Sequence, residues 1–179
     1  MRPFVFLDRD GTLVRDRGYT HRVEDYALLA GVVEGLSALS AAGFGLAIVT
    51  NQSGIGRGRY DESQYQAFAS HLEKDLAQRG VSIDGSYFCP HLPDAGCHCR
   101  KPAPGMLMRA SHQLGAALGA SWVVGNAPCD IGLAIRAGCR GAVWVHPGAD
   151  APERDHYSHV VRAPDVAGAA QVILAAATQ

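Results

Sequence analysis

Short apolar runs that alternate with helical patterns restrict the fold of this chain more than any other feature of its sequence. Most of these runs end at glycine or polar residues, and they occupy residues 4–7, 46–49, 87–88, 122–125 and 143–145. Segments between them carry apolar residues at helical spacing, such as Val32, Leu36 and Leu39. Strands that alternate with helices form a parallel sheet that is covered on both faces. We therefore predict an α/β fold built on a doubly wound parallel sheet.

Local capping signals predict where several helices begin and end. Asp61 is a candidate N-cap, and Gly80 is the expected stop of the helix that follows it. Pro104 is expected to begin another helix. The two remaining helices are expected at 131–137, with Asp130 as its cap, and at 166–176.

Length and charge exclude several classes of protein. The 179 residues fit one domain, which we predict to span residues 1–179. No apolar run approaches the roughly 18 to 20 residues of a membrane span, and the apolar stretch before Asp8 is too short for a secretory signal. The formal net charge of −1 offers no overall attraction to nucleic acids or anionic lipids. We expect a cytoplasmic protein without membrane or nucleic-acid partners, and a monomer.

Polar side chains gather where the predicted strands end, which is where ligands bind to open parallel sheets. These residues follow a strand or precede a helix: Asp8, Asp10, Thr50, Asn51, Arg100, Lys101, Asn126 and Asp130. Two aspartates one residue apart can divide the work of catalysis, because one attacks an electrophile while the other moves a proton. An isolated Asp-x-Asp pair is also typical of a turn or a cap, so the pair alone leaves both interpretations open.

The segment from Phe6 to Leu13 reads Phe-Leu-Asp-Arg-Asp-Gly-Thr-Leu and resembles the first motif of the haloacid dehalogenase superfamily of phosphotransferases. Segments similar to the second, third and fourth motifs follow in the family's order, at 49–52, 100–102 and 125–130. The resemblance implies a three-layer Rossmann-like doubly wound parallel sheet of the haloacid dehalogenase-like type. No large insertion separates the motifs, so no large cap domain is expected.

The resemblance also implies a phosphatase, a hydrolase of phosphoric monoesters. Asp8 is the expected nucleophile and forms an aspartyl-phosphate, while Asp10 protonates the leaving alcohol and then activates the hydrolytic water. Thr50 and Lys101 are expected to hold the transferring phosphoryl group. Phosphoryl transfer needs mainly in-line positioning and donors around the equatorial oxygens, which these residue types supply.

A catalytic Mg²⁺ is implied as well, with oxygen ligands from Asp8, Asp10, Asn126 and Asp130. Asn126 departs from the family pattern, which usually has an aspartate at this position. A neutral amide oxygen can still bind Mg²⁺, so we expect a weaker metal site. The sharper alternative is that the change has disabled catalysis and left a module that binds phosphosugars.

Three of the five cysteines lie within residues 89–99. In a reducing compartment such clustering indicates a metal rather than disulfides. Composition alone leaves buried unliganded thiols open, with His98 as a competing ligand. The segment resembles the zinc loop of the heptose bisphosphate and histidinol-phosphate phosphatase subfamily. This resemblance implies a structural Zn²⁺ bound by Cys89, His91, Cys97 and Cys99, which would hold Arg100 and Lys101 in place.

The segments 16–21, 52–58 and 104–107 resemble the heptose bisphosphate phosphatases more than the histidinol-phosphate phosphatases. This resemblance implies a small phosphosugar as substrate, namely D-glycero-D-manno-heptose 1,7-bisphosphate, which loses its 7-phosphate in lipopolysaccharide biosynthesis. The residues implied to contact it are Asp16, Arg17, Gly18, Tyr19, Asn51, Gln52, Ser53 and Arg100. The guanidinium fork of Arg100 suits the second phosphate. Histidinol phosphate remains an alternative, as does the 3'-phosphate of a polynucleotide, because the second and third motifs also resemble polynucleotide kinase phosphatases.

Overall fold

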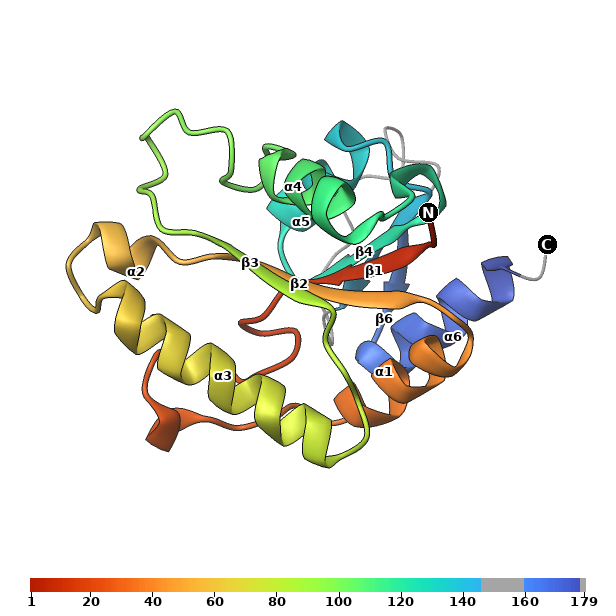
Figure 1. Ribbon diagram of the computed structural model, residues 1–179, viewed down its shortest axis with the longest axis horizontal. Helices are drawn as coiled ribbons and strands as arrows, with labels where there is room; N and C mark the ends of the chain where they lie inside the picture. The colour runs from red at the N-terminus through yellow and green to blue at the C-terminus, as the bar shows by residue number, and fades with distance from the viewer. Residues whose placement is uncertain (146–159, 178–179) are drawn as a thin grey trace.

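The computed structural model describes residues 1–145 and 160–177 and contains one parallel sheet of six strands (Figure 1). Its order is β3-β2-β1-β4-β5-β6, and every neighbouring pair is parallel. The strands are β1 (Phe4–Leu7), β2 (Gly45–Asn51), β3 (Gly85–Cys89), β4 (Trp122–Gly125), β5 (Gly141–Val145) and β6 (Val160–Ala163). The predicted α/β fold is confirmed. The sixth strand was not predicted, because Arg162 interrupts its apolar residues and leaves only two consecutive valines.

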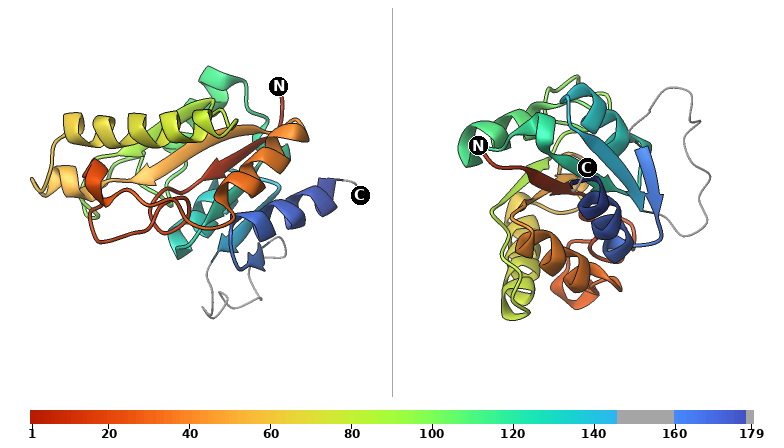
Figure 2. Two further views of the ribbon diagram at one scale, coloured as in Figure 1. Left: turned by 90° about the horizontal axis from the view of Figure 1, so that it is seen from below. Right: turned by 90° about the vertical axis from the view of Figure 1, so that its right-hand side faces the viewer.

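Helices cover both faces of the sheet (Figures 1 and 2). The face that Figure 1 shows below the sheet carries α1 (Val32–Ala41), α3 (Glu62–Gln78) and α6 (Val166–Ala177). The opposite face carries α4 (Gly105–Leu114) and α5 (Pro128–Arg136). Short helical turns complete the described chain: η1 (Val23–Asp25), α2 (Ser53–Gly56) and η2 (Leu118–Ala120).

The alternation of side chains along β1 explains why two separate cores form. Val5 and Leu7 point into the core beneath α1, α3 and α6, whereas Phe4 and Phe6 point into the core beneath α4 and α5. Successive residues of a strand face opposite sides of the sheet, so a strand covered on both faces must be apolar throughout. This requirement makes the four residues of β1 completely apolar and fixes the position of the polar residue that follows them.

The expected helix ends are mostly confirmed, with one correction. Asp61 caps α3, since its side chain accepts from Gln64 N and the Gln64 side chain accepts from Asp61 N. Asp130, however, is not the N-cap of α5. This helix begins at Pro128, and the Asp130 carboxylate within its first turn accepts from the backbone N–H of Ala127 at 3.0 Å. Proline fits the first helical position, so the helix begins at Pro128 and not at the predicted residue 131.

The described connections contain no large cap over the carboxyl ends of β1, β2 and β4. Between β2 and β3 the chain forms only α2 and α3. Among the described residues, no helix combines the length and the apolar character needed to cross a membrane. The carboxyl ends of the three central strands are therefore where the candidate site must be sought.

Candidate active site

A buried lysine between two carboxylates forms the centre of the site. Lys101 is 3% exposed, and its Nζ lies 2.6 Å from Asp8 Oδ1 and 2.7 Å from Asp130 Oδ1. The same ammonium donates to the carbonyl of Val49 at 2.8 Å. Asp8 directly follows β1, Val49 lies in β2 and Asp130 in α5, so three separate elements meet at one cation. The structure thus brings Asp8 and Lys101, two residues singled out from the sequence, into direct contact.

Burial and charge act against each other in this cluster. Burial raises the pKa of Asp8 to about 7, although the neighbouring Lys101 ammonium opposes this shift. Burial by itself would lower the pKa of Lys101, but the carboxylates of Asp8 and Asp130 outweigh it and raise that pKa. Lys101 is therefore protonated at neutral pH. A proton or a further cation at Asp8 is favoured more than it would be at an exposed aspartate.

Asp10 lies beside a buried guanidinium that the sequence reasoning did not single out. Arg9 is 1% exposed, and its Nη2 donates to Asp10 Oδ1 at 2.8 Å and to Asp10 Oδ2 at 2.9 Å. Its Nε also donates to Oδ1, at 3.0 Å. Arginine is rarely buried unless it is paired. Because the chain contains many arginines, nothing in the sequence distinguishes Arg9 from those that face solvent. The contact between Arg9 and Asp10 could be recognised only from the structure.

Thr50 and Asn51 are the last residues of β2, and they serve the site in different ways. Asn51 Oδ1 accepts from Lys101 N at 3.0 Å, and Asn51 Nδ2 donates to Lys101 O at 3.2 Å. This reciprocal pair fixes the backbone on either side of the Lys101 side chain. The Thr50 hydroxyl is buried and accepts from Gln52 Nε2 at 2.8 Å.

Gln52, expected among the substrate contacts, is buried and only 2% exposed. Its amide nitrogen donates to Thr50 Oγ1 and to Asp10 Oδ2. Its amide oxygen accepts from the hydroxyl of Tyr60 at 2.5 Å and from Arg9 at 3.2 Å. The side chain therefore has no donor or acceptor left for a substrate. Tyr60 is a further residue of the site that the sequence did not indicate.

The oxygen ligands predicted for Mg²⁺ are only partly available in this arrangement. Asn126 lies against the turn after Asp8, because a Cβ added to Gly11 would lie 3.1 Å from Asn126 Cγ. Gly11 also has a φ of +78°. Glycine therefore suits this turn because it tolerates the positive φ and because it has no Cβ to clash with Asn126. Asp130, by contrast, is fully buried and uses one oxygen for Lys101 and the other for Ala127 N. Its geometry is that of a group that orients Lys101.

The four side chains predicted to bind Zn²⁺ do converge. One ligand atom each from Cys89, His91, Cys97 and Cys99 lies within 4.8 Å of all the others. The three Sγ atoms are 3.3 to 3.6 Å apart, and His91 Nδ1 is 3.5 and 3.2 Å from the Sγ atoms of Cys89 and Cys99. A tetrahedral zinc with bonds of about 2.3 Å to sulfur requires S···S distances of roughly 3.8 Å. The cluster is therefore compatible with zinc. All five cysteines are free of disulfide bonds.

The remaining predicted contacts are exposed or half-buried, and we refer to them as the rim. Asp16 accepts from Gly18 N at 2.8 Å, and exposed Arg17 faces Asp25 at 3.8 Å. Tyr19, which is 39% exposed, lies 4.5 Å beneath the Arg59 guanidinium. Ser53 begins α2. Arg100 donates to the carbonyl of His91 at 3.4 Å, which connects it to the cysteine cluster.

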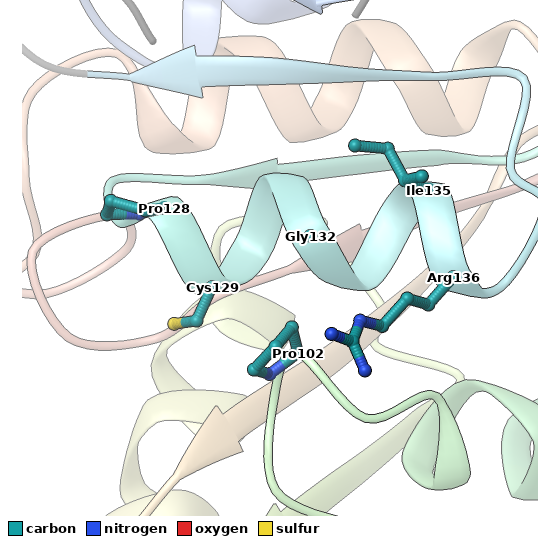
Figure 3. Close-up of a pocket in the computed structure, with 6 residues that line it drawn as sticks. All are labelled: Pro102, Pro128, Cys129, Gly132, Ile135 and Arg136. Carbon is teal, nitrogen blue, oxygen red and sulfur yellow. The ribbon is translucent and has the colours of Figure 1, made fainter. Parts of the chain in front are cut away.

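A separate shallow pocket lies between α5 and the loop that carries Pro102 (Figure 3). Pro102, Cys129 and Arg136 are among the residues that line it, and the Arg136 side chain extends towards Pro102. Gly132 lets α5 approach the loop after Lys101, since an added Cβ would lie 2.9 Å from Pro102 Cβ. This pocket therefore reflects the close packing of α5 on the loop that carries Lys101.

Comparison with known families gives two matches along the chain. A family model described as polynucleotide kinase 3 phosphatase matches residues 3–128. A second, described as HAD-hydrolase-like, matches residues 98–169. Together they span all four strand-end segments.

Curated relatives and solved structures agree with these matches. The D-glycero-beta-D-manno-heptose-1,7-bisphosphate 7-phosphatase of Yersinia pestis is 42% identical over 153 residues, which cover 82% of this chain and 81% of that protein. The enzyme of the same name from Escherichia coli strain K12 is 40% identical, with 82% and 80% covered. The crystal structure of the D,D-heptose 1,7-bisphosphate phosphatase from B. bronchiseptica, complexed with magnesium and phosphate, has a TM-score of 0.84 and 30% identity. It covers 97% of this chain and 99% of that one.

Proposed function

Because this chain belongs to the haloacid dehalogenase-like phosphatases, in the group that contains the heptose-1,7-bisphosphate 7-phosphatases, we propose that it removes the 7-phosphate of D-glycero-D-manno-heptose 1,7-bisphosphate. Water is the second substrate, and the heptose monophosphate and inorganic phosphate are the products. The reaction belongs to the biosynthesis of lipopolysaccharide sugars.

One observation supports the proposal above the others: the carboxylate of Asp8 is buried, stands at the end of β1 and contacts Lys101 Nζ at 2.6 Å. A carboxylate removed from water is a better nucleophile than a solvated one, and an ammonium beside it attracts a phosphate dianion. The identity of the sugar is inferred from the activity of the relatives.

The first step forms a bond between a carboxylate oxygen of Asp8 and phosphorus, while the bond from phosphorus to the sugar oxygen breaks. The leaving oxygen takes a proton from the carboxyl group of Asp10. The positive charge of Lys101 and the Thr50 hydroxyl stabilise the charge on the equatorial oxygens of the transferring group.

The second step returns the enzyme to its starting state. The Asp10 carboxylate removes a proton from a water molecule as the water oxygen attacks phosphorus, and the bond to Asp8 breaks. Inorganic phosphate leaves, and Asp10 is protonated again. The sum of the two steps is the hydrolysis of one phosphomonoester by one water molecule.

Two metals fit the donor sets on the chain. Oxygen atoms of Asp8, the Asp10 backbone and Asn126 are the hard ligands that Mg²⁺ prefers; when bound, the ion neutralises charge on the phosphoryl oxygens. Asp130 is better assigned to the orientation of Lys101, because both of its oxygens have protein partners. The thiol and imidazole cluster suits a structural Zn²⁺. Free thiols are typical of a reducing compartment, so we place the enzyme in the cytoplasm, and we propose a monomer.

Recognition of the sugar and its second phosphate falls to the exposed rim. We assign it to Arg100, which the zinc loop supports, and to the backbone and side chains of Asp16, Arg17, Gly18 and Tyr19, with contributions from Asn51 and Ser53. A guanidinium fork binds a phosphate through two parallel hydrogen bonds. An ester with one phosphate lacks that contact, so it should bind more weakly.

The direct test measures phosphate release from heptose 1,7-bisphosphate, with and without Mg²⁺, and from histidinol phosphate. The expected result is Mg²⁺-dependent release from the bisphosphate, with at least a tenfold preference in kcat/KM, about 1.4 kcal/mol. Asp8→Asn and Asp10→Asn serve as inactive variants. Faster turnover of histidinol phosphate would reject the proposed substrate, and no turnover of either compound would favour a binding module.

A second activity has a specific observation behind it, since the polynucleotide 3' phosphatase family model covers residues 3–128. An uncapped site can admit a chain end that carries a 3'-phosphate. The net charge of −1 argues against affinity for a polyanion. A 3'-phosphorylated oligonucleotide included in the same assay distinguishes the two activities.

A further inference from the structure

Gln52 occupies the centre of a saturated hydrogen-bond network inside the site. Its amide nitrogen donates to Asp10 Oδ2 and to Thr50 Oγ1, both at 2.8 Å. Its amide oxygen accepts from Tyr60 at 2.5 Å and from Arg9 at 3.2 Å. A glutamine side chain has two donor hydrogens and two acceptor lone pairs. All four are used, within a side chain that is 2% exposed.

The four partners permit only one orientation of the amide. The Arg9 guanidinium can only donate, so the group facing it must be the carbonyl oxygen. A carboxylate oxygen of Asp10 faces the other end, which must then be the NH₂ group. A flipped amide would place two donors together on one side and two acceptors together on the other. Arg9 and Tyr60 thus dictate which end of Gln52 faces the reacting groups.

This orientation determines the direction of the Thr50 hydroxyl hydrogen. Gln52 donates to Thr50 Oγ1, so the single hydrogen of that hydroxyl must point away from Gln52. The hydroxyl is then free to act as a donor towards the phosphoryl group. With the opposite amide orientation, the hydroxyl hydrogen would be drawn to the Gln52 carbonyl and lost to the reaction.

Gln52 also acts together with Arg9 on the carboxylate of Asp10. Arg9 contacts both oxygens, and Gln52 adds a second donor to Oδ2. Arg9 is itself held by the Thr20 carbonyl at 2.6 Å and by the ring of Phe68, whose centroid lies 4.7 Å from its guanidinium carbon. The Asp10 side chain is therefore attached to well-packed groups, and its rotamer is fixed before a substrate enters.

We propose that Gln52, oriented by Arg9 and Tyr60, is a positioning residue that sets both the acid–base carboxylate of Asp10 and the hydrogen-bond direction of Thr50. This inference rests on the proposed phosphatase reaction through Asp8 and Asp10. It replaces the expected contact between Gln52 and the substrate with an indirect role in both chemical steps.

The test compares two esters that differ in their need for a general acid. The leaving group of 4-nitrophenyl phosphate departs without a proton, whereas that of an alkyl phosphate such as 2-phenylethyl phosphate requires one. Gln52→Leu removes all four hydrogen bonds at nearly constant volume. Tyr60→Phe removes only the hydroxyl that fixes the amide, and it is the second variant in case the first does not fold. The matched controls are Gln113→Leu, at an exposed position, and Tyr26→Phe, whose hydroxyl donates to Asp75 at 2.7 Å away from the site.

General acid–base catalysis contributes about 10²- to 10⁴-fold, so we expect Gln52→Leu to lose about 100-fold in kcat on the alkyl ester, with a smaller loss for Tyr60→Phe. On 4-nitrophenyl phosphate, Gln52→Leu should release a burst of nitrophenolate and then turn over slowly. In that case the first step no longer needs the acid, but hydrolysis of the aspartyl-phosphate still needs Asp10 as a base. Both controls should match the unchanged enzyme.

Several results would overturn the proposal. Equal losses on the two esters without a burst would mean that Gln52 only maintains the structure. A change confined to KM would identify a substrate ligand. An unchanged rate in a folded Gln52→Leu variant would contradict the positioning role of Gln52. It would leave the proposed phosphatase activity standing, because the enzyme would still be active. An unchanged enzyme that hydrolyses neither ester would instead contradict the proposed function and remove the premise of the inference.

Discussion

Replacing Lys101 with methionine should destabilise this protein far more than the loss of an ordinary lysine. The substitution removes a cation that lies 2.6 Å from Asp8 and 2.7 Å from Asp130, which are 7% and 0% exposed. Each contact has a Coulomb energy of about 6 kcal/mol at an effective dielectric constant near 20. Desolvation offsets most of this energy while the cluster is intact, but both carboxylates stay buried when the lysine is gone. Breaking a buried pair in this way costs about 3–5 kcal/mol.

The loss should depend on pH in a defined direction. The pKa of Lys101 is raised above its ordinary value, so its contribution to stability is complete at pH 7 and is lost only in strongly alkaline solution. Removing it deletes an interaction that lowers the pKa of Asp8, which is already raised to about 7. Asp8 of the variant is therefore protonated over a wider range. The destabilisation should be largest near pH 8 and fall to roughly half below pH 6, as the orphaned carboxylate takes up a proton.

Urea unfolding of the Mg²⁺-free protein between pH 5.5 and 8 measures these changes. The matched control is Lys74→Met, because Lys74 is the other lysine of the chain and is exposed on α3. The double variant Lys101→Met/Asp130→Asn should be less destabilised than the sum of the two single variants, by about 1–3 kcal/mol, since it leaves one buried charge fewer. A pH-independent change below about 1 kcal/mol in Lys101→Met would refute the argument.

Three further predictions concern the metals. Asn126→Asp should bind Mg²⁺ about tenfold more tightly, because a carboxylate replaces a neutral amide, and equal affinities in calorimetry would contradict this. Mg²⁺ affinity should fall about tenfold per pH unit below the Asp8 pKa of about 7, because a proton competes for the carboxylate there, and it should stay level above that pH. An Asp8→Asn variant with the same pH profile would reject this cause. Cys97→Ala should lose bound zinc by elemental analysis and about 3 kcal/mol of stability, roughly 6–12 °C in Tm, whereas unchanged melting would argue against a structural metal.

Much of the architecture could be read from local sequence because its causes are local. An uninterrupted apolar β1 indicates a strand buried on both faces, and Asp8 marks the point where that strand ends. Asp61 could be recognised as a cap because its partner Gln64 is three residues away. The cluster of cysteines and His91 could be recognised for the same reason, since Cys89 and Cys99 are only ten residues apart in sequence.

Where the structure suggests a role other than the predicted one, the cause is that burial and hydrogen-bond partners arise between distant segments. A glutamine in a sequence can face either solvent or the interior. Gln52 faces the interior, where Tyr60 and Arg9 donate hydrogen bonds to its amide oxygen. Asp130 has the composition of a metal ligand, but the fold places it against Lys101, 2.7 Å away, and its other oxygen against Ala127 N.

The sequence by itself determined the parallel α/β sheet, the strand ends that carry Asp8 and Thr50, and the grouping of the cysteines. These features follow from periodicity and short-range order along one segment. Only the tertiary structure decided which polar groups meet, because the energy of a buried charge or amide depends on the partners that the folded chain brings to it. Arg9 is the clearest case: its charge is evident in the sequence, but its place beneath Asp10 is set by the packing of the whole core.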